Sequence, residues 1–321
     1  MKKSVVLISI LVIAIFLTGC GKTQTAQNIT SGSAYIGGTD GLSVSFVENA
    51  PPSVVYDKPS DGSINPFDIN VRIENKGEFD VVKPKCVLKI TGIDPVAFGK
   101  TSTDFRQEIK EDLLKTKRSG GTVIPGTFTV LSIPNLAYGS AVSGQVGPFN
   151  LRASICYEYK TEASSNICVL KDLLGTTRRE GLCKPTETKS VENSGGPVKI
   201  DKLEQSVSGK DSLAFTFTIK HVGDKKNVVF MNEDQGCKMD DMQKQDKVKV
   251  QVLLGTADIT SSCSGINSGV ANLYADTGAQ VRCTQTLSTT REDFVQPVKI
   301  IMSYDYYQYV DKQITVRQVG T

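Results

Sequence analysis

The side chains with the most definite chemistry are eight cysteines. No Cys-x-x-Cys pair occurs and the spacing does not resemble a zinc ribbon, so disulfides are favoured over metal ligation. Cys168 and Cys183 flank a single excursion of the chain, and closing that loop of about 15 residues would contribute roughly 3 kcal/mol. We therefore expect two disulfides that each bracket one loop, Cys168–Cys183 and Cys263–Cys283.

The remaining cysteines leave the disulfide connectivity open. Cys86 with Cys156 would tie two strands of the first half together, and this is the third pair that we expect. Cys237 is then left over, either as a buried thiol or as a link to another chain. Seven cysteines lie beyond Cys20, and because seven is odd, at least one of them is unpaired or linked to another chain.

His221 is the sole histidine, which limits the catalytic chemistry that the chain can perform. A His-cluster metal site and a two-His relay are excluded, and we expect His221 to be a solvated turn residue. The sequence contains no G-x-S-x-G motif, P-loop or dinucleotide fingerprint. We therefore assign no catalytic residue, no metal ligand and no cofactor.

Two other clusters could bind a ligand. Glu233, Asp234, Asp240 and Asp241 could supply oxygen ligands to calcium, but their spacing does not match a D-x-D-x-D-G loop and favours a solvated acidic loop. The second cluster is the tyrosine-rich segment 304–309. Alternation points Tyr304 and Tyr306 inward and two other rings outward, and these are the possible partner contacts Tyr307 and Tyr309.

The N-terminus carries a targeting pattern. Lys2 and Lys3 precede an apolar run from Val5 to Leu17, which is short for a bilayer span. The run ends in Leu-Thr-Gly-Cys, which resembles the lipobox of prokaryotic lipoproteins. The resemblance implies cleavage after residue 19 and a diacylglyceryl anchor on Cys20. The alternatives are an ordinary secretory signal and an uncleaved N-terminal helix.

Composition restricts the partners of the mature chain. The sequence has 37 Lys+Arg and 34 Asp+Glu, and removal of the signal leaves a net charge near +1. This balance argues against nucleic acid. The expected partners are membrane lipid, through the Cys20 anchor, and an unknown protein or glycan. Asn28 begins a glycosylation sequon, which matters only if the host glycosylates exported chains.

Alternating apolar residues predict an antiparallel β fold. Residues 67–73 alternate strictly between apolar and polar, and Asn75 to Glu78 supplies a turn. One segment departs from this pattern, because Phe105, Ile109 and Leu113 recur every four residues among charges. This spacing predicts a short helix over Asp104 to Lys117.

An internal repeat indicates two copies of one domain. The alternating segment from Phe67 to Gly77 has a counterpart from Leu213 to Gly223, at an offset of 146 residues. Tyr157-Glu158-Tyr159 has a counterpart in Tyr304-Asp305-Tyr306, at an offset of 147 residues. Two segments that share nearly one offset favour tandem duplication.

The expected layout is all-β, with two tandem antiparallel immunoglobulin-like β-sandwich domains and a short helix inserted in the first. Residues 69–81 resemble the strand–N-x-G–strand opening of prokaryotic immunoglobulin-like and fibronectin-III-like modules. The layout is also similar to that of archaeal surface lipoproteins with paired domains. The predicted segments are a signal peptide (1–19), a flexible tether (20–41), domain 1 (42–188), a linker (189–195) and domain 2 (196–321).

These features predict a lipid-anchored protein on the cell membrane that faces outside the cytoplasm and acts as a non-enzymatic binding or spacer module. One alternative is an accessory subunit of an envelope assembly that recruits a partner by strand addition. Another is a carboxylate-dependent polysaccharide hydrolase, which would need a cleft with two suitably spaced acids.

Overall fold

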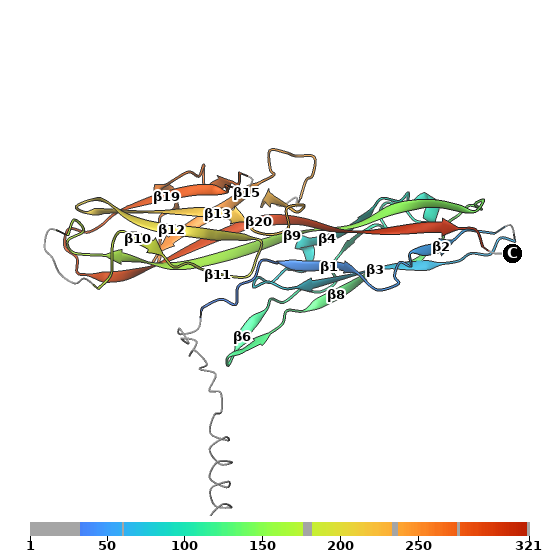
Figure 1. The fold of residues 1–321 in the computed structure, drawn as a ribbon, viewed down its shortest axis with the longest axis horizontal. Coiled ribbons are helices and arrows are strands. Elements are labelled where there is room, and N and C mark those ends of the chain that lie inside the picture. Colours follow the sequence, from blue (N-terminus) through green and yellow to red (C-terminus); the bar gives the residue numbers. More distant parts are fainter. Residues whose placement is uncertain (1–32, 60, 176–181, 233–236, 275–276, 320–321) are drawn as a thin grey trace, which may run out of the picture. The chain divides into compact units, whose positions relative to one another are not determined.

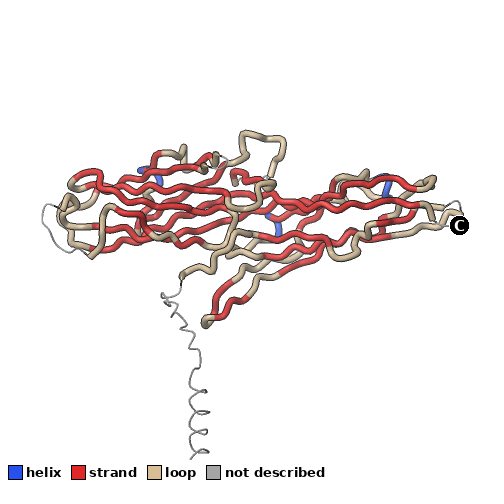
Figure 2. The backbone as a smooth tube through the Cα atoms, viewed as in Figure 1, coloured by secondary structure: helices blue, strands red, loops and turns tan. Residues whose placement is uncertain are grey.

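The computed structural model describes residues 33–59, 61–175, 182–232, 237–274 and 277–319. The chain divides into two units, residues 1–34 and residues 35–321, and almost all of the described residues belong to the second. This unit is all-β (Figures 1 and 2), and its described residues include no α-helix. The described residues also form three short 3₁₀ helices, at Lys83–Lys85, Val96–Phe98 and Thr260–Ser262.

The strands follow one another along the whole unit. Strands β1 to β8 are Leu42–Phe46, Val54–Tyr56, Phe67–Asn75, Cys86–Thr91, Arg106–Glu108, Lys117–Ser119, Thr122–Ile124 and Phe128–Leu136. Strands β9 to β14 are Gln145–Val169, Glu187–Lys189, Glu192–Asn193, Val198–Gly209, Ser212–His221 and Val228–Met231. Strands β15 to β20 are Lys247–Leu254, Ala257–Asp258, Cys263–Ser264, Val270–Asn272, Ala279–Thr286 and Phe294–Arg317.

A ten-stranded sheet joins the two halves of the sequence. Its main order is β16-β15-β20-β9-β4-β5. In addition, β2 and β14 pair with β20, β11 pairs with β9, and β18 pairs with β15. At its centre, β9 and β20 are antiparallel and run side by side along almost their full length (Figure 1). Tyr157 lies opposite Tyr306, and Tyr159 lies opposite Tyr304.

Two smaller sheets cover the inner face of the ten-stranded sheet near opposite ends of β9 and β20 (Figure 1). One has the order β1-β3-β8 and the other has the order β10-β12-β13-β19-β17. Side chains on the longer strands of these sheets and of the ten-stranded sheet alternate between buried and accessible, as in β3 and β9. The alternation arises because successive Cβ atoms point to opposite faces of a strand. The two-stranded β6–β7 hairpin is exposed along its length.

Four tyrosines form the centre of the core. Tyr157, Tyr159, Tyr304 and Tyr306 are at most 2% exposed, and their rings contact edge to face or tilted at centroid distances of 5.8–6.4 Å. Each such pair contributes roughly 0.5–1.5 kcal/mol beyond area burial. The inward orientation agrees with the alternation in the sequence.

Each of these buried hydroxyls has a hydrogen-bond partner. The Tyr157 hydroxyl accepts from the Leu42 amide at 3.0 Å, and the Tyr159 hydroxyl donates to the Gly195 carbonyl at 2.9 Å. The Tyr304 hydroxyl pairs with Thr161 Oγ1 at 2.6 Å. The Tyr306 hydroxyl pairs with a ring nitrogen of His221 at 2.8 Å. These partners offset the cost of burying the polar groups.

The helix predicted over residues 104–117 is wrong. The segment forms turns, strand β5 and the first residue of β6. Phe105, Ile109 and Leu113 are nonetheless buried, at 3%, 0% and 1% exposure. A separation of four residues is a multiple of two as well as close to one helical turn, so an extended chain also places these side chains on one face.

The compact unit begins before the predicted end of the tether. Residues 35–41 belong to it, and the Glu78 carboxylate accepts hydrogen bonds from the amides of Ile36 and Gly37 at 2.9 and 2.8 Å. The same carboxylate accepts from the Gly195 amide at 2.7 Å. Part of the predicted linker is also paired, because β11 (Glu192–Asn193) lies against β9. Electrostatic and backbone contacts therefore fasten both segments to the sheets.

Candidate functional site

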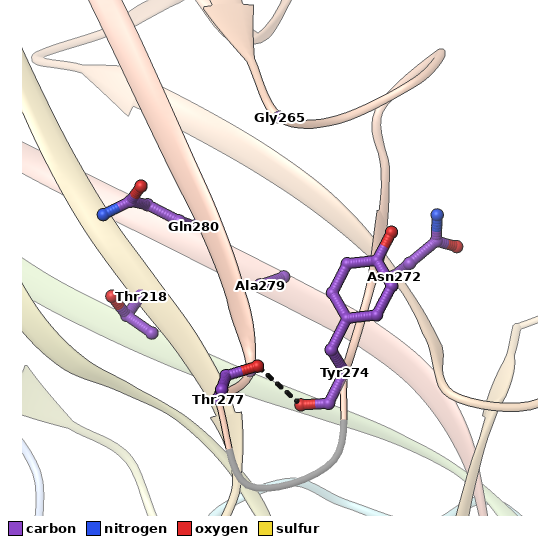
Figure 3. A pocket seen from close by; sticks show the side chains of 8 residues that line it. Thr218, Gly265, Asn272, Tyr274, Thr277, Ala279 and Gln280 are labelled. Carbon is purple, nitrogen blue, oxygen red and sulfur yellow. Dashed lines mark hydrogen bonds between the residues drawn. The ribbon is translucent and has the colours of Figure 1, made fainter.

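The described residues form a pocket of about 510 Å³ around Tyr274 (Figure 3). The Tyr274 side chain is 65% exposed, and its ring stands beside the Asn272 amide. Thr218 and Gln280 lie on neighbouring strands at the other side of the pocket. Thr277 donates a hydrogen bond from its hydroxyl to the Tyr274 carbonyl at 3.4 Å. The site therefore combines one exposed aromatic ring with amides and hydroxyls.

Strand geometry explains why these side chains converge. Thr218 on β13 lies opposite Gln280 on β19, so both side chains point to the same face of the five-stranded sheet. On the other wall, Ala271 and Leu273 are buried at 0% and 7% exposure. Alternation then turns Asn272 and Tyr274 outward on the same side. The pocket thus forms where β18 of the large sheet meets β13 and β19.

Two of the lining residues are glycines at positions that exclude other residues. Gly278 has φ +72°, and a Cβ there would lie 2.2 Å from the Ile219 carbonyl oxygen. Gly265 has φ +87°, and a Cβ there would lie 2.2 Å from the Gln280 carbonyl oxygen. Other residues are strained at such φ values and would collide with backbone. The Cys263–Cys283 disulfide, two residues before Gly265, fixes this wall to β19.

The described residues that line the pocket are polar or small and uncharged. No charged side chain lines it within the described part of the chain. Amide and hydroxyl groups both donate and accept hydrogen bonds, and the Tyr274 ring offers an apolar face. The arrangement suits non-covalent binding of a small polar molecule.

A second pocket of about 520 Å³ shares Tyr274 and contains His221. A ring nitrogen of His221 lies 2.8 Å from the Tyr306 hydroxyl, and burial lowers the pKa of the imidazole. Asp246 also lines this pocket, and burial raises the pKa of its carboxyl. The prediction that His221 is a solvated turn residue is therefore corrected. It ends β13, where its ring packs against the buried Tyr306 ring.

The structure forms the two disulfides that bracket loops, Cys168–Cys183 and Cys263–Cys283. It also joins Cys156 to Cys237, which the sequence left unassigned. The Cys156–Cys237 bond links residues 81 positions apart and fastens the segment after β14 to the outer face of β9.

The predicted Cys86–Cys156 pair is wrong, because the two side chains lie on opposite faces of the sheet. Cys86 is paired across strands with Tyr157, and Cys156 with Val87. Residues paired across antiparallel strands share a face, so Cys86 faces the core with Tyr157 while Cys156 faces outward. Among the described cysteines, Cys86 alone is unpaired, and burial raises the pKa of its thiol to about 12.

Tyr307 and Tyr309 lie on the outer face of β20 and are half-buried. Their ring centroids are 6.1 Å apart. The Arg152 guanidinium lies 3.7 Å from the Tyr309 ring centroid and forms two hydrogen bonds with Asp311, at 2.7 and 2.9 Å. These contacts order the two rings, and their role as partner contacts stays a prediction.

Several predicted features lie outside the described residues. They are the signal peptide, Cys20, Asn28, Glu233 and Asp234. Within the described ranges, no group of three His, Cys, Asp or Glu side chains is arranged to hold a metal ion. None of the described segments forms a helix that is both long and apolar enough to cross a membrane.

The Tyr274 pocket was missed at the sequence level. Its local signal is the alternation of Ala271 and Leu273 with Asn272 and Tyr274, which exposes an aromatic ring beside an amide. The opposite wall, with Thr218 and Gln280, comes from strands that are distant in sequence from β18. Cross-strand pairing therefore had to be known before the pocket could be recognised.

Comparison with known proteins identifies no family for this chain. No family model and no curated protein matches the sequence. Among solved structures, a secreted serine protease from Vibrio cholerae, VesC, matches at 9% identity with a TM-score of 0.17. The match covers 87% of this chain and 52% of the protease chain, so this chain spans about half the length of VesC.

Proposed function

We propose that this protein is a lipid-anchored, extracytoplasmic binding module of the cell envelope. The observation that carries the proposal is the exposed Tyr274 ring in a polar pocket, on a β unit that contains three disulfides. Disulfides persist in oxidising compartments outside the cytoplasm. A rigid platform that presents a pocket is the arrangement expected of a binding protein.

The anchor rests on the N-terminal sequence. Lys2 and Lys3, the apolar run and Leu-Thr-Gly-Cys support lipidation of Cys20. A diacyl group supplies two chains, which hold a protein on a membrane stably, whereas one chain binds only marginally. The anchor would tether the β unit to the outer side of the membrane, where disulfides form.

We also propose that the β unit arose by duplication of an immunoglobulin-like sandwich. The repeat offset of 147 residues converts the pair Tyr157–Tyr306 into the pair Tyr304–Tyr159, and both pairs occur in the sheet. Two copies related by a local two-fold axis produce this register. Gly77 and Gly223 occupy corresponding positions in the two copies. A Cβ at Gly77 would collide with the Tyr159 hydroxyl, and a Cβ at Gly223 would collide with the Tyr306 hydroxyl.

A second candidate, strand addition by an envelope partner, is favoured by strand β8. This strand lies at the edge of the three-stranded sheet, and its Phe128 and Val130 side chains are 54% and 41% exposed. An apolar edge strand can pair with a segment of another chain. Val130→Lys would weaken such a contact and leave binding at Tyr274 unchanged.

Crosslinking on intact cells tests the proposed function. Cells that express the wild-type chain, Cys20→Ser or Tyr274→Ala are treated with a membrane-impermeant crosslinker, and the captured species are compared. We expect wild type to be crosslinked at the surface, Cys20→Ser to be lost from the membrane fraction, and Tyr274→Ala to lose the partner. A chain that the reagent reaches only after lysis would contradict the proposal.

A further inference from the structure

We propose that the Tyr274 pocket binds a neutral saccharide. The inference rests on the proposed binding function and gives it a ligand class. A sugar ring has an apolar face of C–H groups and a rim of hydroxyls. The pocket offers a matching pair of surfaces, which are the exposed Tyr274 ring and the polar groups of Thr218, Asn272, Thr277 and Gln280.

The hydrogen-bonding groups of the pocket suit hydroxyl ligands. Each sugar hydroxyl both donates and accepts, and so do the side chains of Asn272, Gln280 and the two threonines. An amide presents its donor and acceptor side by side, so one amide can bond two adjacent hydroxyls. Asn272, Thr277 and Gln280 are exposed and can therefore exchange water for ligand without rearranging the fold.

Charge argues for a neutral ligand. The described lining of the pocket contains no Lys, Arg, Asp or Glu, so a phosphate, sulfate or uronate would meet no ion partner. The neighbouring pocket contains Lys220, but its ammonium is 2.7 Å from the Asp201 carboxylate. The Lys220 ammonium is therefore already paired with a carboxylate.

Size and rigidity are also appropriate. The volume of about 510 Å³ falls in the range of roughly 300–1,000 Å³ that is usual for small-molecule sites. Gly265 and Gly278 line the pocket without a side chain, and the Cys263–Cys283 bond joins the strand before Gly265 to β19. A preformed site of this kind loses little entropy when it binds.

Calorimetric titration of the full chain tests the inference. The protein is kept in a detergent that has no sugar headgroup, and the probes are the neutral hexasaccharides of maltose, cellulose, mannan and chitin type. Oligogalacturonate serves as the charged probe. We expect at least one neutral probe to bind, and Tyr274→Ala to weaken that binding about tenfold or more. Asn272→Ala and Gln280→Ala should weaken it less, because each removes only part of the hydroxyl contacts.

Tyr56→Ala is the matched control, because Tyr56 on β2 is 47% exposed and lies outside the pocket. It should leave binding unchanged, and far-UV circular dichroism should show that every variant is folded. The inference is overturned if no neutral probe binds, if binding survives Tyr274→Ala, or if oligogalacturonate alone binds. If crosslinking still captures a surface partner in that case, the proposed function stands and the saccharide inference fails. If both experiments fail, both proposals fall.

Discussion

Tyr157→Phe removes a single oxygen from the middle of the core and tests how the sheets are held together. The Tyr157 hydroxyl accepts from the Leu42 amide of β1 at 3.0 Å and donates to Gln308 Oε1 of β20 at 3.3 Å. All three residues are at most 7% exposed. In the variant, the buried Leu42 amide loses its acceptor and the buried Gln308 Oε1 loses its donor. Each such group costs about 1–3 kcal/mol, so we expect a loss of about 2–6 kcal/mol in the free energy of unfolding.

Urea unfolding of the oxidised protein, followed by far-UV circular dichroism, measures this loss. Tyr309→Phe is the matched control, because that ring is half-buried on the opposite face of β20. The control should change the free energy of unfolding by less than about 0.5 kcal/mol. If Tyr157→Phe is as stable as the control, the hydroxyl does not connect β1 and β20 energetically, and the reasoning about the shared core is wrong.

Three further predictions concern the thiol, the histidine and one carboxylate. Without reductant, iodoacetamide should label Cys86 only after unfolding, because the thiol is buried and burial raises its pKa to about 12. Mass spectrometry locates the label. Labelling of Cys86 in the native protein, or of another described cysteine, would contradict the disulfide map. The single histidine NMR signal should titrate below the ordinary value of 6.5, because burial lowers the pKa of His221. The unfolded chain then binds the proton more readily, so His221 should reduce stability as the pH falls below 6.5, and a midpoint at or above 6.5 would refute this account. Glu78→Gln should cost about 1.5–3 kcal/mol because it replaces a carboxylate that accepts from three amides. Hydrogen exchange at Gly37 and Gly195 should accelerate, and unchanged exchange would show that the carboxylate does not hold these segments.

Local alternation made much of the sheet structure predictable. The pattern from Phe67 to Ile73 marks β3, and the inward orientation of Tyr304 and Tyr306 follows from the same period of two. This signal depends only on neighbouring residues, so it survives without knowledge of the fold. The repeat was equally visible, because it compares the sequence with itself.

The predicted helix and the predicted Cys86–Cys156 disulfide were wrong. The helix rested on a spacing that also fits an extended chain, and the disulfide depended on the register between two strands. The spacing of Phe105, Ile109 and Leu113 fits both a helix and an extended chain, and the structure forms turns and the short strand β5 there. Cys86 and Cys156 lie on adjacent strands, but the register places them on opposite faces. A shift of one residue would reverse that outcome, and no local pattern fixes the register.

The candidate site depended even more on tertiary structure. Asn272 and Tyr274 are close in sequence, whereas Thr218 reaches the pocket only because β13 pairs with β19. The polar character of these residues is typical of any solvated strand face. Their convergence around an exposed ring, which gives them a possible function, exists only in the folded sheets.

The most direct test of the account is the mass of the N-terminal peptide of the mature protein, isolated from membranes of the native host. We expect a peptide that begins at Cys20 and carries a diacylglyceryl group on the thiol. Surface proteolysis of the same cells should release the β unit from residue 35 onward. A peptide that begins at Met1, or an unmodified Cys20, would contradict the claim that this is a lipid-anchored protein of the cell envelope.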